Sequence, residues 1–535
     1  MQIEANFVDI EEREIYPVRA VVSEGKIVSI ERIDTPCEHY LLPGFIDAHI
    51  HIESSMLPPS EFARLAVCHG TVATVSDPHE IANVLGIEGV KYMLESAEEV
   101  DFKFYFGASP CVPATPFETS GAVLGPKEVG ALLEMPQINY LSEVMNFPGV
   151  IAGDKDMLAK IAIARRLGKR IDGHAPGLRG EDLTKYIAAG IETDHEAFSY
   201  EEGLEKIEKG MKILIREGSA AKNFDALAPL IAKYPEKLMF CSDDRHPNDL
   251  AREHIDGHVR RSIARGYDLF DVLRIACLNP VEHYGLEVGR LRIDDPADFI
   301  IVEDLKSFRV IETVIRGRVQ AKEGKPLFDS VKKKTPNNFH AARKNAADFS
   351  TQLCDHAEVI HALDHQLITQ EEIVDFPSER PEILKLTVVN RYEAEAAPSV
   401  AWVDGFGLKK GAIASSVAHD SHNILATGCS DELISKAVNA IIGQKGGICA
   451  VDEEHIWLLP LPIAGLMSDE EGFDVAARYA EIDRIVREEF ASPLSAPFMT
   501  LSFMALLVIP ELKLSDKGLF DGRGFHFIDT CRRGV

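Results

Sequence analysis

The chain has 535 residues, of which 57 are basic and 85 acidic, giving a net charge of −28 at pH 7. This length predicts two or three domains, and a hydrophobic content of 46% is sufficient for large cores. A protein with this negative charge is repelled by nucleic-acid phosphates and by anionic membrane surfaces, so we expect neither as a binding partner.

The cysteines predict a cytoplasmic protein. Nine of them are scattered along the chain without any CxxC pair, a pattern typical of reduced thiols. The acidic start MQIEANFVDIEEREIYPV lacks the pattern of a signal peptide. The apolar run 492–510 contains three prolines and several hydroxyl residues, so we interpret it as a buried helix and loop rather than a membrane span.

From residue 41 to about 290, strand-like runs alternate with polar loops and amphipathic, helix-like runs. Eight such units predict an α/β fold, a TIM-type (β/α)8 barrel over residues 41–284. The predicted strands are 41–49, 71–77, 102–109, 138–144, 170–175, 190–196, 211–219 and 237–244, and helix-like runs include 59–70, 157–168 and 183–190.

The first of these strands, LLPGFIDAHIHI (41–52), contains two histidines two positions apart. Residues i and i+2 of a strand point to the same side, so His49 and His51 project together. Two imidazoles on one face supply half of a metal site. A histidine pair in a strand is more often incidental, so the pair needs support from other residues.

That support lies at the ends of the other predicted strands. In barrels of this kind the active site lies at the carboxyl ends of the strands. Any one of these polar residues could be structural, but polar residues at seven or eight strand ends indicate a site. The residues are Asp77, Glu143, His174, His195, Glu217, Asp243 and Asp244.

The stretch PGFIDAHIH, with the order H-x-H, E, H, H, D along the chain, resembles the amidohydrolase superfamily. The resemblance implies two divalent metals inside the barrel, Mn²⁺ foremost, with Fe²⁺ or Zn²⁺ as alternatives. Many relatives bridge the metals with a carboxylated lysine on strand 4; Glu143 supplies a carboxylate there without modification. The implied ligands are His49, His51, Glu143, His174, His195 and Asp243.

Longer stretches resemble the bacterial and archaeal adenine deaminase family: IDAHIHIESSMLPP, SDPHEIANVLG, EVMNFPGVI, IREGSAAKN, CSDDRHP and, near the C-terminus, GFGLKKGAIASSVAHDSHN. This implies hydrolytic deamination of free adenine to hypoxanthine and ammonia by a metal-bound hydroxide, as in purine salvage. It implies the class of hydrolases that act on the C–N bond of a cyclic amidine. We also expect a homo-oligomer, a dimer.

The resemblance also implies a division of the chain. Residues 1–40 and 285–325 would pair into a small β-sandwich beside the barrel. Residues 326–362, polar and rich in lysine, predict a linker. Residues 363–535 would form a separate α+β C-terminal adenine deaminase domain.

The chemistry suggests roles for particular carboxylates. Asp243 would take the proton of the attacking hydroxide, with Asp244 and Glu80 as further catalytic residues. Glu80 would also contact the purine ring at N1 or another edge, unless it merely stabilises the start of a helix. Asp77, Glu217 and Ser219 are further predicted substrate-binding residues.

Two loops, DPHE (77–80) and CVPATPF (111–117), are expected to close over the base. For the C-terminal motif HDSHN (419–423) we favour a structural role or one at the rim of the site over a further metal site.

Three other readings remain open: a cyclic amidase, an N-acetylglucosamine-6-phosphate deacetylase, and a catalytically inactive scaffold on the same fold. Glu143 in place of a lysine disfavours the first, and the complete set of expected ligands disfavours the last.

Overall fold

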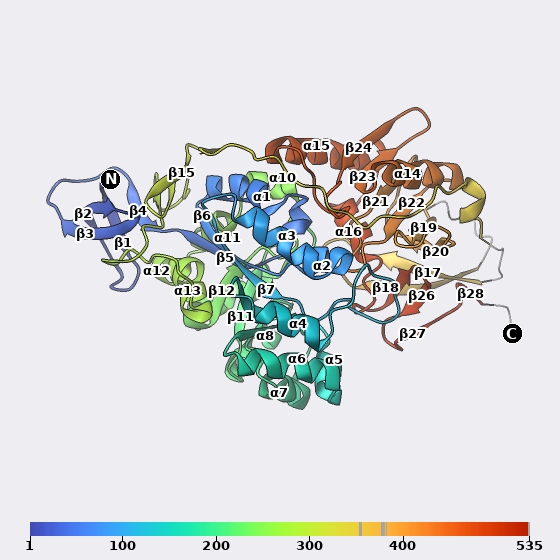
Figure 1. Cartoon of the computed structure of the whole chain (residues 1–535), viewed down its shortest axis with the longest axis horizontal. Coiled ribbons are helices and arrows are strands. Elements are labelled where there is room, and N and C mark those ends of the chain that lie inside the picture. The colour runs from blue at the N-terminus through green and yellow to red at the C-terminus, as the bar shows by residue number, and fades with distance from the viewer. Residues whose placement is uncertain (352–355, 376–379, 381, 533–535) are drawn as a thin grey trace.

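The computed structural model describes residues 1–351, 356–375, 380 and 382–532. An N-terminal sheet lies at one end of the molecule, parallel strands surrounded by helices occupy the middle, and a second large sheet lies at the other end (Figure 1). The site described below lies between the middle part and the C-terminal part.

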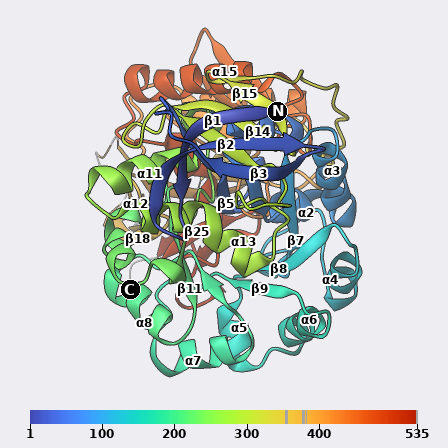
Figure 2. The ribbon, with the colours of Figure 1, turned by 90° about the vertical axis from the view of Figure 1, so that its left-hand side faces the viewer.

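The N-terminal sheet joins two distant parts of the chain. Its order is β16-β15-β14-β13-β4-β1-β2-β3, so that β4 pairs with β1 on one side and with β13 on the other. Figure 2 shows β1, β2 and β3 of this sheet nearest the viewer. Alternate residues, such as Ile3 and Ala5 of β1, are buried in its core. The strands are β1 (Gln2–Asp9), β2 (Glu14–Ser23), β3 (Lys26–Arg32), β4 (Tyr40–Pro43), β13 (Phe299–Val302), β14 (Val310–Ile315), β15 (Arg318–Lys322) and β16 (Lys325–Pro326).

The middle of the molecule is built on parallel strands. One sheet has the order β5-β6-β7-β8-β9 and a second has the order β10-β11-β12. The amide of Asp243, just beyond β12, donates to the carbonyl of His49 at 2.9 Å, and the amide of Glu192 donates to that of Ile171 at 3.0 Å. The strands are β5 (Phe45–Ile50), β6 (Thr71–Ser76), β7 (Lys103–Ala108), β8 (Ile138–Val144), β9 (Arg170–Gly173), β10 (Thr193–Asp194), β11 (Lys212–Arg216) and β12 (Leu238–Cys241).

Amphipathic helices connect these strands. Seven of the eight predicted strand ranges contain an observed strand, and the first, 41–49, overlaps β5, which extends one residue further. In α6 the Asp154 side chain accepts a hydrogen bond from the amide of Met157, which satisfies a free N–H group at the start of the helix. The helices are α1 (Pro59–Ala66), α2 (His79–Leu85), α3 (Ile87–Ala97), α4 (Pro126–Leu133), α5 (Phe147–Ala152), α6 (Lys155–Arg166), α7 (Gly180–Ala188), α8 (Tyr200–Glu208), α9 (Phe224–Leu227), α10 (Pro247–Arg252), α11 (Ile255–Ala264), α12 (Leu269–Leu273) and α13 (Asn279–Tyr284).

The C-terminal part has a mixed sheet of order β18-β17-β20-β19-β22-β21-β23-β24, with β28 also paired to β17. Helix α14 packs on it through Ile434, Ala437, Val438 and Ile441. Its elements are β17 (His356–Ala362), β18 (Thr369–Asp375), β19 (Leu384–Val389), β20 (Ser399–Asp404), β21 (Ala412–Ser415), β22 (Ile424–Gly428), α14 (Asp431–Gln444), β23 (Gly447–Val451), β24 (Ile456–Pro460), α15 (Gly472–Arg484), α16 (Pro497–Phe503), β25 (Leu512–Ser515), β26 (Gly518–Asp521), β27 (His526–Phe527) and β28 (Cys531–Arg532).

Two segments can be compared directly with the sequence analysis. The stretch expected as a linker, 326–362, contains the strand β17, which pairs with both β18 and β20. The apolar run 492–510 contains α16, whose residues are all buried, as predicted. Within the part of the chain that the structure describes, no helix has the length and apolarity needed to cross a bilayer.

Candidate functional site

The carboxyl ends of the parallel strands bring a buried set of histidines and carboxylates together. His49 and His51 project from the end of β5 with their Nε2 atoms 3.2 Å apart. The His51 Nδ1 atom lies 3.1 Å from the Asp77 carbonyl oxygen, so its proton is held there and Nε2 is free to act as a ligand. The His49 ring stacks on that of His195, with centroids 4.0 Å apart.

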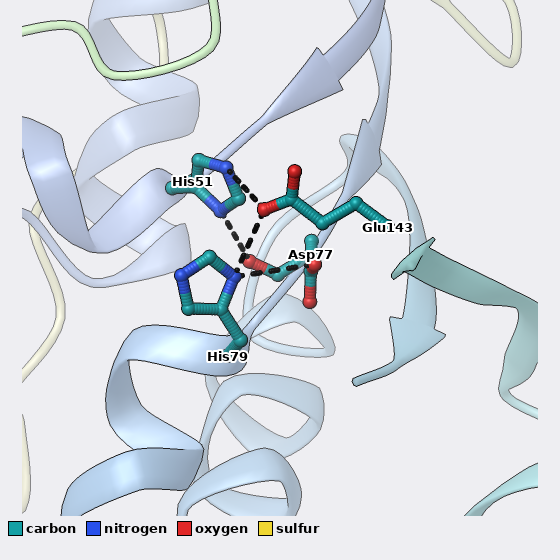
Figure 3. Close-up of side chains that lie close together, drawn as sticks. All are labelled: His51, Asp77, His79 and Glu143. Carbon is teal, nitrogen blue, oxygen red and sulfur yellow. Dashed lines mark hydrogen bonds and ion pairs between the residues drawn. The ribbon is translucent and has the colours of Figure 1, made fainter. Parts of the chain in front are cut away.

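Glu143, at the end of β8, lies between two pairs of histidines. Its Oε1 atom is 3.4 Å from His51 Nε2 and 3.4 Å from His79 Nδ1, as Figure 3 shows. Its Oε2 atom is 2.8 Å from His174 Nδ1 and 3.2 Å from His195 Nε2. Burial alone would raise the pKa of Glu143, but His174 and His195 hold that pKa well below its ordinary value.

Asp243 follows β12 with a φ of 55°, a left-handed conformation that aspartate tolerates better than most residues. Its Oδ1 atom lies 3.4 Å from His49 Nε2 and 3.1 Å from His51 Nε2. Its Oδ2 atom accepts a hydrogen bond from Arg216 at 2.6 Å. Although burial raises the pKa of Asp243, Arg216 and the two histidines hold it well below its ordinary value.

Asp244 has a different environment from its neighbour. It accepts a hydrogen bond from the Ser54 hydroxyl. Burial raises its pKa, and the nearby charge of Asp243 adds to the rise, although His419 opposes it. Adjacent carboxyl groups whose pKa values are shifted in opposite directions suit a division of labour between base and acid.

Glu80, in the first turn of α2, is held by the C-terminal part of the chain. Its Oε1 atom is 2.7 Å from His419 Nδ1, and its Oε2 atom is in contact with His422 Nε2. The Ala418 amide donates to His422 Nδ1 at 3.2 Å, so the His422 proton is on Nε2 and faces Glu80. Burial favours a raised pKa for Glu80, but the histidines, His419 first, hold it well below its ordinary value.

The other predicted substrate-binding residues each contact another side chain. Asp77 lies 3.2 Å from His79 Nδ1 and accepts a hydrogen bond from Ser109. Glu217 forms an ion pair with Arg261 at 2.8 Å. Ser219 donates to Asp249 at 2.6 Å. Of the motif IREGS, it is Arg216 whose side chain reaches the histidine cluster.

Sequence reasoning missed several residues of this cluster. His79 directly precedes Glu80 in the same motif, and Glu196 directly follows His195, so their neighbours were a usable signal. Arg216 pairs with both Glu196 and Asp243, and an arginine at the end of a buried strand was a weaker signal. The contact of His419 and His422 with Glu80 places the motif HDSHN at the site itself. Asp420 of this motif forms, with His79 and Glu80, another group of ligand atoms within 4.8 Å of one another, so the choice of a structural or rim role over a further metal site stays a prediction.

A small cavity of about 20 Å³ lies at the cluster, and we call its polar lining the floor and its apolar lining from the C-terminal part the roof. The floor includes His51, His79, His174, His195, Glu143 and Asp243. The roof comes mainly from the C-terminal part, through Leu367, Phe503, Leu506 and Ile509. The DPHE loop reaches this cavity through His79 and Glu80. Phe117 of the CVPATPF loop packs instead on Phe520 of β26, with centroids 4.9 Å apart.

The donor atoms fit a centre of divalent metals. Several sets of buried ligand atoms lie within 4.8 Å of one another: His49, His195 and Asp243; Glu143, His174 and His195; His51, Asp77, His79 and Glu143. Imidazole nitrogens and carboxylate oxygens are the donors that Zn²⁺, Fe²⁺ and Mn²⁺ bind. Because Glu143 and His195 belong to more than one set, adjacent ions could share ligands.

The chain matches two family models, "Amidohydrolase family" over residues 40–320 and "Adenine deaminase C-terminal domain" over residues 361–526. It is 76% identical to the adenine deaminase of Sulfurovum sp. (strain NBC37-1), covering 100% of both chains. It is 57% identical to that of Salinibacter ruber, covering 98% of both chains.

Solved structures are more remote. A β-aspartyl dipeptidase from Fervidobacterium islandicum is 17% identical, with a TM-score of 0.46 over 60% of this chain and 96% of that one. An adenosine deaminase from Xanthomonas campestris with bound zinc is 14% identical, with a TM-score of 0.45 over 61% of this chain and 96% of that one.

Proposed function

The chain belongs to the adenine deaminase family, and from this premise we propose that it hydrolyses free adenine to hypoxanthine and ammonia. The observation that carries the proposal is the full-length identity of 76% to an adenine deaminase. The cluster of buried histidines and carboxylates beneath an apolar roof supports it, because a flat purine needs an apolar contact surface and the reaction needs an activated water.

We further propose that β5–β12 close into one (β/α)8 barrel over residues 41–284. The hydrogen bonds from Asp243 to His49 and from Glu192 to Ile171 support closure. Residues 1–40 and 285–325 form the small β-unit, and 363–535 form the C-terminal domain together with β17, the strand at the end of the connecting stretch 326–362. Free thiols at the described cysteines, such as Cys68 and Cys111, support a cytoplasmic location. We also propose that the protein is a homodimer.

Two divalent ions, Mn²⁺ foremost, would be held by His49, His51, Glu143, His174, His195 and Asp243. Such ions lower the pKa of a water molecule so that it becomes a nucleophile near neutral pH. The placement of Glu143, with one oxygen facing His51 and the other facing His174 and His195, supports its role as the shared carboxylate. His79 lies close enough to Glu143 to be an additional ligand.

The chain's own carboxylates would manage the protons. Asp243, kept anionic by Arg216, accepts the proton of the attacking water. Glu80 holds or transfers a proton at N1 of the ring, which must accept electron density when C6 is attacked. Asp244, whose pKa is raised, suits delivery of a proton to the departing amino group. The sum is adenine plus water giving hypoxanthine plus ammonia.

The substrate contacts of Asp77, Glu217 and Ser219 stay predictions. Asp77 holds His79 at 3.2 Å, which supports an orienting role. The ion pair of Glu217 and the hydrogen bond of Ser219 leave both residues engaged with other side chains.

The test is to purify the full chain from cells supplied with Mn²⁺ and to follow adenine absorbance and ammonia release. Cyclic amides and N-acetylated sugar phosphates serve as the competing substrates. We expect turnover of adenine that chelation abolishes. Turnover of a competing substrate without turnover of adenine, or no turnover of any, would overturn the proposal.

A further inference from the structure

Lys513, in β25, is a fully buried lysine whose ammonium group is bound only by backbone oxygens in the described structure. Its Nζ atom donates to the carbonyl oxygens of Leu367 at 2.7 Å and Phe503 at 2.9 Å. Burial lowers the pKa of Lys513 to about 7. Burying an amine without a carboxylate partner is costly, so the position calls for an explanation.

The two carbonyl groups belong to segments far apart in the chain that both form the roof of the cavity. Leu367 precedes β18, and Phe503 is the last residue of α16. Both side chains line the cavity. An apolar side chain at position 513 would leave two buried carbonyl groups without these donors, whereas an amine has enough N–H groups for both.

The same strand holds the roof at a second point. The amide of Leu514 donates to the carbonyl of Met504 at 3.0 Å. The apolar side chains of Phe503, Leu506 and Ile509 form one buried cluster, which includes Ala220 from the loop after β11. The segment 503–509, which is hydrogen-bonded to β25, is therefore also the segment that packs against the parallel-strand part of the molecule.

The roof is also connected to Glu80. The Phe503 ring stacks on the His419 ring, with centroids 4.4 Å apart and an angle of 16° between the planes. His419 Nδ1 in turn lies 2.7 Å from Glu80 Oε1. Three successive contacts thus run from the Lys513 ammonium through Phe503 and His419 to a carboxylate on the floor of the cavity.

We propose that Lys513 is a positioning residue for the substrate pocket. By donating hydrogen bonds to both Leu367 and Phe503, it fixes the position of the roof over the base. It thereby also fixes the position of His419 against Glu80. This rests on the proposed function, since the base is the substrate named there. A planar ring must fit between roof and floor, so a displaced roof weakens binding, and a displaced His419 misaligns Glu80.

The chain offers a matched control. Lys344 is also buried, and its Nζ atom donates to the carbonyl oxygens of Ala394 at 3.3 Å and Ala396 at 2.8 Å. Lys344→Met therefore removes a buried ammonium held by two carbonyl groups at a place that lines no part of the cavity. This variant shows how much activity is lost through lower stability alone, so any further loss in Lys513→Met can be assigned to the roof.

The experiment compares Lys513→Met with Lys344→Met and the unmodified enzyme. We expect Lys513→Met to raise KM for adenine by about tenfold and to lower kcat by about tenfold, the effect of one misplaced group on orientation. Metal content should not change. Lys344→Met should leave KM and kcat within about twofold. Equal effects of the two substitutions, or none from Lys513→Met, would overturn the proposal.

Hydrogen exchange of residues 365–369 and 500–509 gives a readout that needs no turnover. The proposal predicts faster exchange there in Lys513→Met and not in Lys344→Met, and unchanged exchange overturns it. An unmodified enzyme that leaves adenine intact would refute the proposed function instead, and the exchange data would still decide whether Lys513 holds the roof.

Phe503→Leu keeps the ammonium but removes the ring from His419, and it gives a result even if Lys513→Met does not fold. We expect it to lower kcat/KM as well. If Lys513 acts through Phe503, the double variant loses little more than the worse single variant. Losses that simply multiply, or an unaffected Phe503→Leu, would overturn the proposal.

Discussion

Glu143 is the residue on which the proposed metal centre depends most, because its two oxygens face different histidines. Glu143→Gln keeps the size of the side chain and removes its charge. Two dications would then repel each other without a shared anion, so we expect metal content to fall below two per chain and turnover to be lost. Elemental analysis and the adenine assay measure both.

The matched control is Glu118→Gln. Glu118 is buried beside Asp420 but does not line the cavity, and burial raises its pKa to about 8. Its amide variant should keep both metals. Full metal occupancy in Glu143→Gln would rule out the bridging role.

Glu80 gives a second prediction, which separates proton transfer from metal binding. Glu80→Gln should keep its metals and its fold, yet lose roughly 10²–10⁴-fold in kcat if the carboxylate moves a proton. If Glu80 only stabilised the first turn of α2, the change would cost about 1 kcal/mol or less and spare the rate. Turnover, metal content and Tm on this one variant distinguish the two.

The proximity of the six predicted ligands could be predicted from the sequence, whereas their roles as ligands stay predictions. His49 and His51 share a face of a strand, Glu143 lies at the end of a strand, and His174, His195 and Asp243 follow strands, so their approach to one another follows from parallel packing. Arg216 was not predicted because its importance lies in its contact with Asp243, and its position at the end of a buried strand is only a weak local signal of such a contact.

At the scale of elements, the turn between β21 and β22 carries the main surprise. It holds His419 and His422 against Glu80, a residue more than 330 positions earlier in the chain. The strand and helix pattern of the middle part was predictable from hydrophobic periodicity, because each unit packs on its neighbour. The docking of this turn was not, because it depends on how two folded parts meet.

This turn allows a prediction about His422. His422→Phe keeps a ring of similar size but removes the N–H group that faces Glu80. We expect kcat to fall by roughly tenfold or more, since a charge-assisted hydrogen bond worth about 1.5–3 kcal/mol is lost, with metal content unchanged. The control is His455→Phe, on the exposed side of the β23–β24 connection, where activity should be normal. Equal activity of the two variants would contradict the role.

At the scale of the whole molecule, the pocket lies between two parts of the chain, and this geometry predicts selectivity. Leu367, Phe503, Leu506 and Ile509 line a cavity of about 20 Å³, so these side chains must move to admit even the base, and a ribose on N9 would require a larger displacement. We expect kcat/KM for adenosine to be at least 100-fold below that for adenine. This is a stronger discrimination than a difference of one apolar group between two substrates usually produces. Steady-state kinetics on both substrates checks this, and comparable values would refute it.

Lys513 also predicts how stability changes with pH. Its pKa falls from 10.5 to about 7 on folding, so the chain releases a proton when it folds between those pH values. The unfolded state then binds more protons, and stability rises with pH, by up to about 1.4 kcal/mol per pH unit. Relative to Lys513→Met, the Tm of the unmodified protein should therefore increase from about pH 7 to about pH 9. Parallel Tm curves would contradict this.

The order of the site residues along the chain has a consequence for synthesis on the ribosome. The proposed metal donors are all present once residue 243 has been made, whereas His419, Phe503 and Lys513 arrive much later. Because parts of a long chain fold in the order in which they emerge, the nascent protein should expose its donors to solvent before any roof covers them. Metal ions could then bind while the site is still exposed to solvent. The completed C-terminal part would afterwards slow their dissociation.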